Sequence, residues 1–277
     1  MNVNIPSYKK LFDLSGKVSL ITGATGFLGK RFCCGLAESG SSIAVVDLVQ
    51  ENCDLLSKEL NEKYGIRSIG IKCDVSDPVD VQKMVNCVVS EFGQINILHN
   101  NAATKSDNLN AFFAPFEEYS LLEWKKIMSV NLDGMFLVAQ AVGSQMVKQG
   151  TGGSIIQTSS IYGIMGPDNR IYEGSFYMGR EINTPAIYSA SKAGVVGLTK
   201  YLATYWAKNG IRVNTLTPGG TESGQNDEFQ KRYAARIPMN RMANPNEMVG
   251  ALIYLASDAS SYVTGHNLII DGGLNCW

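Results

Sequence analysis

Tyr188 and Lys192 are the residues of this sequence whose types and spacing best fit acid–base chemistry. They stand four residues apart in the segment Tyr-Ser-Ala-Ser-Lys, and residues four apart share one face of a helix. An ammonium group close to a phenol favours the phenolate and lowers its pKa from about 10. We therefore interpret Tyr188 as a proton donor or acceptor near neutral pH, although a chain with 12 tyrosines can also contain this spacing by accident.

A glycine-rich segment, Thr22-Gly23-Ala24-Thr25-Gly26-Phe27-Leu28-Gly29, follows an apolar run and precedes a helical pattern. Glycines allow a sharp turn and let backbone N–H groups approach a pyrophosphate at a helix N-terminus. An ordinary strand-to-helix turn is the alternative. The placement of the glycines between a strand and a helix favours a nucleotide-binding loop.

Asp47 ends the second apolar run, 18 residues after Gly29, and Leu48 follows it. A carboxylate at this place accepts hydrogen bonds from both ribose hydroxyls of a dinucleotide and repels a 2′-phosphate. The sequence therefore predicts NAD rather than NADP as cofactor. A helix cap or a surface role for Asp47 is the alternative.

Ser159 and Ser160 close the fifth apolar run, at the predicted carboxyl end of a strand. A hydroxyl there can stabilise charge on a reacting oxygen. By itself, a pair of serines at a strand end also fits a loop or a cap.

Composition excludes several other classes of protein. The 277 residues carry 24 Lys and Arg against 25 Asp and Glu, so we expect no nucleic-acid partner. The six cysteines form no C-x-x-C pair and the two histidines, His99 and His266, are far apart, so we expect no metal site. Residues 1–14 form a polar lead-in without a signal-peptide core, and no window reaches the roughly 18 apolar residues of a membrane span. Free thiols then favour a cytoplasmic protein.

The elements that must position these residues follow from hydrophobic periodicity. The predicted strands are 17–22, 42–47, 66–73, 95–99, 154–158, 212–215 and 267–270. The predicted helices are 26–39, 50–64, 78–92, 121–149, 188–208 and 245–257. Strand and helix alternate, and the strands are apolar throughout, as when helices cover both faces of a sheet.

This pattern predicts an α/β fold with a doubly wound, Rossmann-type parallel sheet of about seven strands. No linker divides the chain, so we expect residues 1–277 to form a single domain. The long stretches 161–187 and 218–244 lack periodicity. Long loops in compact domains are usually functional, and ligands of open α/β sheets bind at the carboxyl ends of the strands.

In order and placement, these motifs resemble the short-chain dehydrogenase/reductase family from Leu14 to Gly273. The matching pieces are 22–29, Asp47, Cys73-Asp74-Val75, Asn100-Asn101-Ala102-Ala103, Asn131, Ser160, Tyr188 with Lys192, Pro218-Gly219 and Asp271-Gly272-Gly273. The resemblance implies reversible hydride transfer between a nicotinamide and a carbinol or carbonyl carbon. It also implies a homo-oligomer, a tetramer or a dimer.

The resemblance assigns roles to individual residues. Tyr188 would be the general acid/base, and Ser160 would hydrogen-bond the substrate oxygen. Lys192 would hold the nicotinamide ribose and lower the pKa of Tyr188, and Asn131 would support a water chain to Lys192. The remaining positions would contact the cofactor: Asp74 and Val75 at the adenine, Asn101 and Ala102 in the cleft, Pro218 and Gly219 at the nicotinamide, and Thr221 or Ser223 at its carboxamide.

Two features depart from the family pattern. Gly26 falls one place early in the glycine loop, a spacing typical of a longer branch whose members often act on nucleotide sugars. Ser160 and Tyr188 are 28 residues apart, more than is usual in the family, and the extra residues form an insert, 161–187, beside the substrate site. Its polar residues are Asp168, Arg170, Tyr172, Glu173, Tyr177 and Arg180, and the loop 219–241 adds Lys231, Arg232, Arg236 and Arg241.

Arginine would suit an anionic group such as phosphate, whereas tyrosine and aspartate would suit sugar hydroxyls. A solvated loop or an oligomer contact is the alternative for the insert. The insert also resembles that of family members encoded with bacterial flagellin-glycosylation and nonulosonic-acid pathways. That resemblance implies a phosphorylated or nucleotide-linked sugar substrate.

The sequence thus predicts an NAD-dependent dehydrogenase/reductase acting on a polar, sugar-derived small molecule. A reductase of 3-oxoacyl thioesters or small lipophilic ketones is the first alternative, and a groove of Met165, Phe176 and Met178 would favour it. A nucleotide-binding protein without catalysis is the second. The presence of Tyr188, Lys192, Ser160 and Asn131 together argues against that second alternative.

Overall fold

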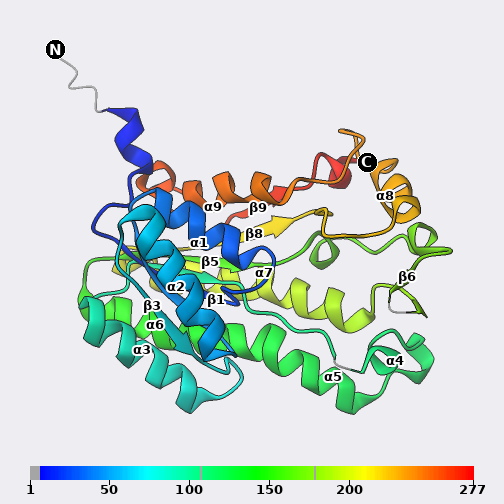
Figure 1. Cartoon of the computed structure of the whole chain (residues 1–277), viewed down its shortest axis with the longest axis horizontal. Coiled ribbons are helices and arrows are strands. Elements are labelled where there is room, and N and C mark those ends of the chain that lie inside the picture. Colours follow the sequence, from blue (N-terminus) through cyan, green and yellow to red (C-terminus); the bar gives the residue numbers. More distant parts are fainter. Residues whose placement is uncertain (1–6, 107, 178) are drawn as a thin grey trace.

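The computed structural model describes residues 7–106, 108–177 and 179–277, and a parallel sheet forms its centre (Figure 1). The strands are β1 (Val18–Thr22), β2 (Ser42–Asp47), β3 (Ser68–Lys72), β4 (Ile97–Asn100), β5 (Gly153–Thr158), β8 (Ile211–Pro218) and β9 (Asn267–Ile270). Their order is β3-β2-β1-β4-β5-β8-β9, and every neighbouring pair is parallel. The predicted doubly wound α/β sheet is therefore confirmed.

Helices cover both faces of this sheet, which explains the continuously apolar strands. One face carries α1 (Gly29–Glu38), α2 (Gln50–Tyr64) and α9 (Val249–Ala256), and the other carries α3 (Pro78–Phe92), α6 (Met135–Gln149) and α7 (Ala186–Trp206). Successive strand residues point to opposite faces. In β1, Leu20 packs into the core under α3, α6 and α7, whereas Ile21 packs into the core under α1, α2 and α9.

A continuous helix runs through α5 (Leu121–Met128), a π-helical turn at Ser129–Gly134 and α6. Within the described part of the chain it is the one helix long and apolar enough to cross a membrane, although the sequence predicted no membrane span. Val138, Val142 and Met146 of α6 are fully buried in the core. This stretch is therefore a core helix of the fold, and its length and apolar character follow from that role.

The two long stretches predicted as loops contain structure of their own. The insert holds two 3₁₀ turns, η4 (Ile161–Gly163) and η5 (Asn169–Tyr172), and an antiparallel hairpin of β6 (Phe176–Tyr177) and β7 (Arg180–Glu181). The second stretch holds α8 (Asp227–Ala234), so the prediction of an unstructured loop is wrong there. The missed signal is a cap, since the Asn226 side chain accepts from the Phe229 N–H at 2.8 Å.

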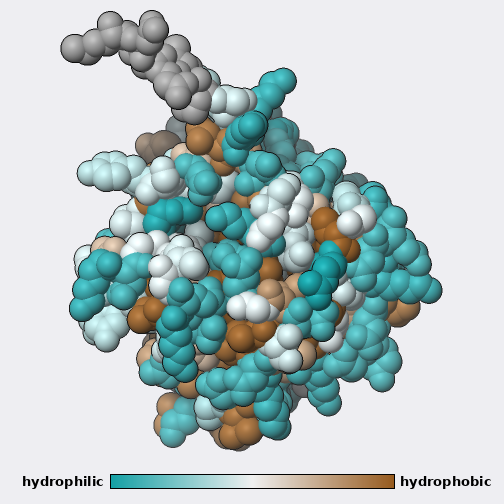
Figure 2. Space-filling model, turned by 90° about the vertical axis from the view of Figure 1, so that its left-hand side faces the viewer, coloured by the Kyte–Doolittle hydropathy of each residue, from teal (hydrophilic) through white to brown (hydrophobic). Residues whose placement is uncertain are grey.

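The two ends of the sheet differ in what they present. The carboxyl ends of the strands lie on the right of Figure 1, together with the insert, α8 and the short helix α4 (Leu109–Phe112). Figure 2 views the opposite end, where mostly hydrophilic side chains surround scattered hydrophobic ones. A pocket of about 560 Å³ at that end is lined by Lys17, Gly153 and Ile211, where strands begin, and by no residue with a predicted role.

Candidate active site

The glycine loop joins β1 to α1 in a turn that only glycine can make. Gly23 has a positive φ of 63°, which residues with a Cβ rarely adopt. A Cβ on Gly29 would lie 2.1 Å from the carbonyl oxygen of Gly23, so α1 can begin there only without a side chain. Gly26 has no positive φ, and a Cβ there would meet only the Gly23 oxygen, at 3.2 Å. The shifted middle glycine is therefore not required by the turn itself.

Asp47 lies beside this loop and binds it. Its carboxylate accepts hydrogen bonds from the Thr25 N–H at 2.9 Å, the Thr25 hydroxyl at 2.7 Å and the Leu48 N–H at 2.8 Å. Phe27 and Leu28 complete the loop, and the Phe27 ring is exposed under the guanidinium of Arg31. The predicted acidic residue thus stands at the carboxyl end of β2, next to the start of α1.

A small pocket of about 160 Å³ opens next to Asp47. The predicted cofactor residues that line it are Gly23, Asp47, Asp74, Val75 and Ala102. Four strand ends, those of β1 to β4, therefore bring these residues together although they are far apart in the sequence. Such a crevice at the carboxyl ends of the strands is where open α/β sheets bind nucleotides.

Asn101 has a structural contact as well as a place near this pocket. Its side-chain amide donates to the carbonyl of Thr22 at 3.2 Å, and the Thr22 hydroxyl accepts from the N–H groups of Asn101 and Ala102, each at 3.0 Å. These bonds join the end of β4 to the glycine turn. Asn101 therefore holds the turn in place and is not itself a lining residue.

The reacting groups predicted from the sequence meet on the other side of β4. Tyr188 lies in the first turn of α7 and lines the same pocket as Ser160, whose side chain lowers the pKa of Tyr188. The two meet because η4 packs directly on α7: a Cβ on Gly163 would lie 2.7 Å from the backbone of Lys192. The Ser159 hydroxyl also donates to the Lys192 carbonyl at 2.7 Å. The insert therefore leaves these contacts intact.

Burial, rather than mutual charge, sets the pKa values of the Tyr188–Lys192 pair. Burial raises the pKa of Tyr188, and the Ser160 hydrogen bond opposes this effect. Burial lowers the pKa of Lys192 to about 8, and its ammonium donates to the Thr158 carbonyl at 3.0 Å. The expected lowering of the Tyr188 pKa by Lys192 is thus not found, because the dominant influence on each group is loss of contact with water.

Asn131 lies in the π-helical turn between α5 and α6 and is fully buried. Its side chain accepts from the Thr104 N–H at 2.7 Å and donates to the Thr104 carbonyl at 3.3 Å. π-Helical turns occur frequently at functional sites. Here the turn directs Asn131 at the segment after β4, and Thr104 in turn lines both pockets of this end of the sheet.

A larger pocket of about 550 Å³ contains Ser160 and Tyr188. Gly219 and Thr221, predicted to lie at the nicotinamide, also line it, whereas Ser223 and Pro218 do not. Sequence reasoning missed several further lining residues, because no motif marks them. These are Thr104, Lys105, Phe112, Asn183, Thr184, Gln225, Phe229 and Tyr233.

The insert contributes tyrosines rather than charges to this pocket. Tyr162 and Tyr172 line it, whereas Asp168 and Arg170 do not. The arginines of the two loops are paired with carboxylates: Arg170 and Arg236 with Asp168, Arg232 with Glu228 and Glu173, and Arg241 with Glu247. Lys231 is exposed. The side chains of Tyr177 and Arg180 lie outside the described part of the structure.

Comparisons with known proteins identify the family to which this chain belongs. A family model described as enoyl-(acyl carrier protein) reductase matches residues 23–275. Curated relatives include D-threitol dehydrogenase from Mycolicibacterium smegmatis, 38% identical over 95% of this chain and 94% of that protein. NADP-dependent mannitol dehydrogenase from Alternaria alternata is 34% identical over 99% of this chain and 98% of that protein. A 3-oxoacyl-[acyl-carrier-protein] reductase from Thermotoga maritima is 36% identical over 94% and 98%.

Solved structures are equally similar. A short-chain type dehydrogenase/reductase from Mycobacterium marinum has a TM-score of 0.85 and 35% identity, covering 98% of this chain and all of that one. An NAD⁺-bound xylitol dehydrogenase has a TM-score of 0.82 and 31% identity, covering 94% and 99%. The chain therefore belongs to the short-chain dehydrogenase/reductase family. It is an NAD(P)-dependent oxidoreductase acting on CH–OH groups, and its relatives use either NAD or NADP.

Proposed function

We propose that this protein is an NAD-dependent dehydrogenase/reductase that interconverts an alcohol of an uncharged polyol and the carbonyl of the corresponding sugar. One observation carries the proposal. Hydroxyl and amide side chains line much of the pocket around Ser160 and Tyr188, next to an apolar side, while Arg170 and Arg236 pair with a carboxylate outside it. Hydroxyl and amide groups match the donors and acceptors of a polyol.

Tyr188 transfers the proton in this proposal. During oxidation its phenol oxygen takes the proton of the substrate hydroxyl, and during reduction it returns a proton to the carbonyl oxygen. Ser160 donates a hydrogen bond to the same substrate oxygen and so stabilises the charge that develops there. NAD, when bound, accepts or supplies the hydride. Lys192 would hold the ribose of the bound cofactor and support the proton transfer by Tyr188, and Asn131 holds Thr104, which lines both pockets.

The preference for NAD over NADP rests on Asp47. Its carboxylate stands beside the pocket of Gly23, Asp74, Val75 and Ala102, where an adenosine would lie. A negative charge there disfavours a 2′-phosphate by charge repulsion and can accept hydrogen bonds from two ribose hydroxyls. Thr25 already occupies one oxygen of this carboxylate. We infer that Thr25 thereby orients the Asp47 carboxylate toward the ribose hydroxyls.

The pocket favours an uncharged substrate over the phosphorylated one that the insert's arginines had indicated. Recognition of phosphate by arginine depends on guanidinium donors that face the ligand. Arg170 and Arg232 instead have carboxylate partners, and the cation that does line the pocket, Lys105, already interacts with another group. The resemblance to sugar-pathway members of the family therefore supports a polyhydroxylated substrate but not a phosphorylated one.

The two alternatives have less support. Met165 and Phe176 do not line the pocket, Phe176 is exposed, and Met178 lies outside the described residues. Phe112 and Phe229 do give the pocket an apolar side, which keeps the 3-oxoacyl or lipophilic ketone reductase as the second candidate. The contact of Tyr188 with Ser160 argues against a protein without catalysis. We further propose one domain over residues 1–277 and a cytoplasmic location.

A substrate and cofactor panel tests this proposal. D-Threitol, xylitol, D-mannitol and a sugar phosphate are offered with NAD and with NADP. An acetoacetyl thioester is offered with NADH and with NADPH, and reduced cofactor is followed by absorbance in every assay. We expect turnover of at least one free polyol, faster with NAD. Tyr188→Phe should lose at least about 10²-fold in kcat, since it removes the proton-transfer group.

Tyr262→Phe is the matched control, because Tyr262 is fully exposed at the opposite end of the sheet. Undiminished turnover by Tyr188→Phe would refute the mechanism. Faster turnover with NADP would refute the role of Asp47, and activity on the thioester alone would establish the alternative function.

A further inference from the structure

We propose that Tyr172, which the insert contributes, is a specificity-determining residue whose hydroxyl hydrogen-bonds a second hydroxyl of the substrate, next to the reacting one. The inference rests on the proposed polyol oxidoreductase function and deepens it. It also assigns the insert a purpose, since Tyr172 is the residue of η5 that reaches the pocket together with Tyr188.

The position of Tyr172 is close to the reacting group. Its side chain is 8% exposed and lines the same pocket as Ser160 and Tyr188. Tyr188 packs against the hydrophobic cluster to which Tyr172 belongs, so the two phenols lie in the same part of the pocket wall. A substrate whose reacting oxygen lies at Tyr188 therefore presents its neighbouring carbon atoms to Tyr172.

The hydroxyl of Tyr172 belongs to a chain of hydroxyl groups along one wall. It lies 2.5 Å from the Thr184 hydroxyl and donates to the Tyr162 hydroxyl at 3.3 Å. Tyr162 and Tyr233 line the same pocket. Each hydrogen bond between two of these hydroxyl groups uses the single proton of its donor. Most of the hydroxyl protons are therefore already donated, whereas lone pairs on the oxygens remain free to accept.

This surplus of lone pairs gives the wall a chemical preference. It can accept hydrogen bonds from substrate O–H groups, whereas a phosphate or carboxylate would face acceptor against acceptor. Burial raises the pKa of Tyr162 and of Tyr172, so both phenols stay protonated and neutral. The wall therefore fits a neutral molecule with several hydroxyl groups.

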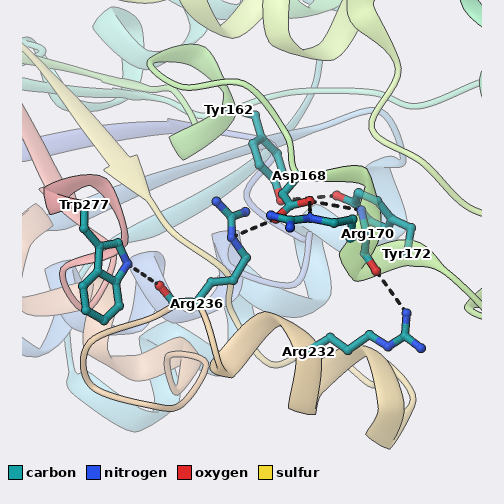
Figure 3. Close-up of polar contacts among 7 residues, drawn as sticks. All are labelled: Tyr162, Asp168, Arg170, Tyr172, Arg232, Arg236 and Trp277. Atoms are coloured by element: carbon teal, nitrogen blue, oxygen red, sulfur yellow. Dashed lines mark hydrogen bonds and ion pairs between the residues drawn. The ribbon is translucent and has the colours of Figure 1, made fainter.

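The insert holds Tyr172 in a fixed position, as recognition of a substrate hydroxyl requires. Figure 3 shows Asp168 between Arg170 and Arg236, with Arg232 of α8 below them. Asp168 accepts two 2.8 Å bonds from Arg170 and pairs with Arg236 at 3.3 Å. Arg232 donates to the carbonyl of Arg170 at 3.0 Å and to Glu173 at 3.2 Å, so η5 and the residue that follows it are both tied to α8.

The aromatic ring of Tyr172 is fixed by the same helix. Its centroid lies 5.6 Å from that of Phe229, which in turn lies 5.6 Å from Tyr233. Both partners are residues of α8. Preorganised groups lose little freedom when a ligand binds, and the hydroxyl of Tyr172 is therefore held at a defined place in the pocket.

The test compares Tyr172→Phe with wild type on substrates that have or lack extra hydroxyls. D-Threitol, xylitol and D-mannitol carry them, and 2-propanol and cyclohexanol do not. We expect kcat/KM to fall about tenfold or more on the polyols, mainly through KM, and to change less than about twofold on the simple alcohols. A merely structural role would lower both groups of rates together.

Thr184→Val provides a second variant, because it removes the hydroxyl partner of Tyr172 but leaves the ring packing. It should shift the polyol KM in the same direction by a smaller factor. Tyr262→Phe is the control. Equal losses on polyols and simple alcohols, or no loss on either, would overturn the role of Tyr172 alone. Absence of wild-type activity on every polyol would overturn the proposed function and this assignment with it.

Discussion

At the scale of single residues, the environment decides what each predicted group can do. Tyr188 and Lys192 share a face of α7 as their spacing predicts, but burial moves their pKa values in opposite directions. Burial favours the neutral form of each group, so the Lys192 ammonium loses its proton at a lower pH than the Tyr188 phenol. The first proton should therefore leave near the Lys192 value of about 8.

The pH dependence of catalysis follows from this value. Alcohol oxidation requires a site that has lost a proton, so its rate should rise with pH through an apparent pKa near 8. Carbonyl reduction requires the proton, so its rate should fall over the same range. In Lys192→Met the remaining group is Tyr188, whose pKa burial raises, and the oxidation profile should move to higher pH. Initial rates from pH 6 to 10 in both directions measure this, and an unchanged profile in Lys192→Met would contradict it.

At the scale of elements, the insert and α8 act together. The sequence indicated charged residues near the substrate, and the structure places them where they hold one element on the other. Arg170 is largely exposed, whereas Asp168 and Arg236 are more buried and link the residue before η5 to the segment just after α8. Arg170 and Arg236 hold the pKa of Asp168 at about 2, so this link persists above about pH 4.

Removal of the Asp168 ion pairs should make Tyr172 more mobile without changing a residue that lines the pocket. Asp168→Asn is expected to raise KM for polyols severalfold, less than Tyr172→Phe, and to leave rates on 2-propanol nearly unchanged. Asp80→Asn is a matched control, because it removes an exposed ion pair with Lys83 far from the site. Steady-state kinetics of the two variants measure the difference. Equal effects of both substitutions would show that the Asp168 link does not position the insert.

At the scale of the whole molecule, an apolar surface on α7 points to self-association. Tyr201 and Tyr205 are 63% and 58% exposed, stand four residues apart, and stack on one another with centroids 5.8 Å apart. Exposed aromatic patches often mark contact surfaces between proteins. We expect the predicted homo-oligomer, a dimer or a tetramer, to use this surface of α7 as an interface.

Light scattering measures this assembly directly. We expect a mass of two or four times 30.1 kDa for the wild type and a smaller mass for the double variant Tyr201→Glu with Tyr205→Glu, because buried carboxylates oppose association. Tyr262→Glu changes an exposed tyrosine outside α7 and should leave the mass unchanged. A monomeric wild type would contradict the prediction.

The sequence alone was sufficient for the sheet, the glycine turn and the placement of Tyr188 and Lys192 on one face of a helix. These depend on local patterns: apolar runs, a glycine at a positive φ, and helical spacing. The tertiary structure decided which side chains line the substrate pocket. Tyr172, Thr184 and Tyr233 come from three separate segments, and no spacing relates them. Whether Arg170 faces a ligand or Asp168 also depends on how the insert packs on α8, because a side chain's partner is set by contacts across the fold and not by its neighbours along the chain.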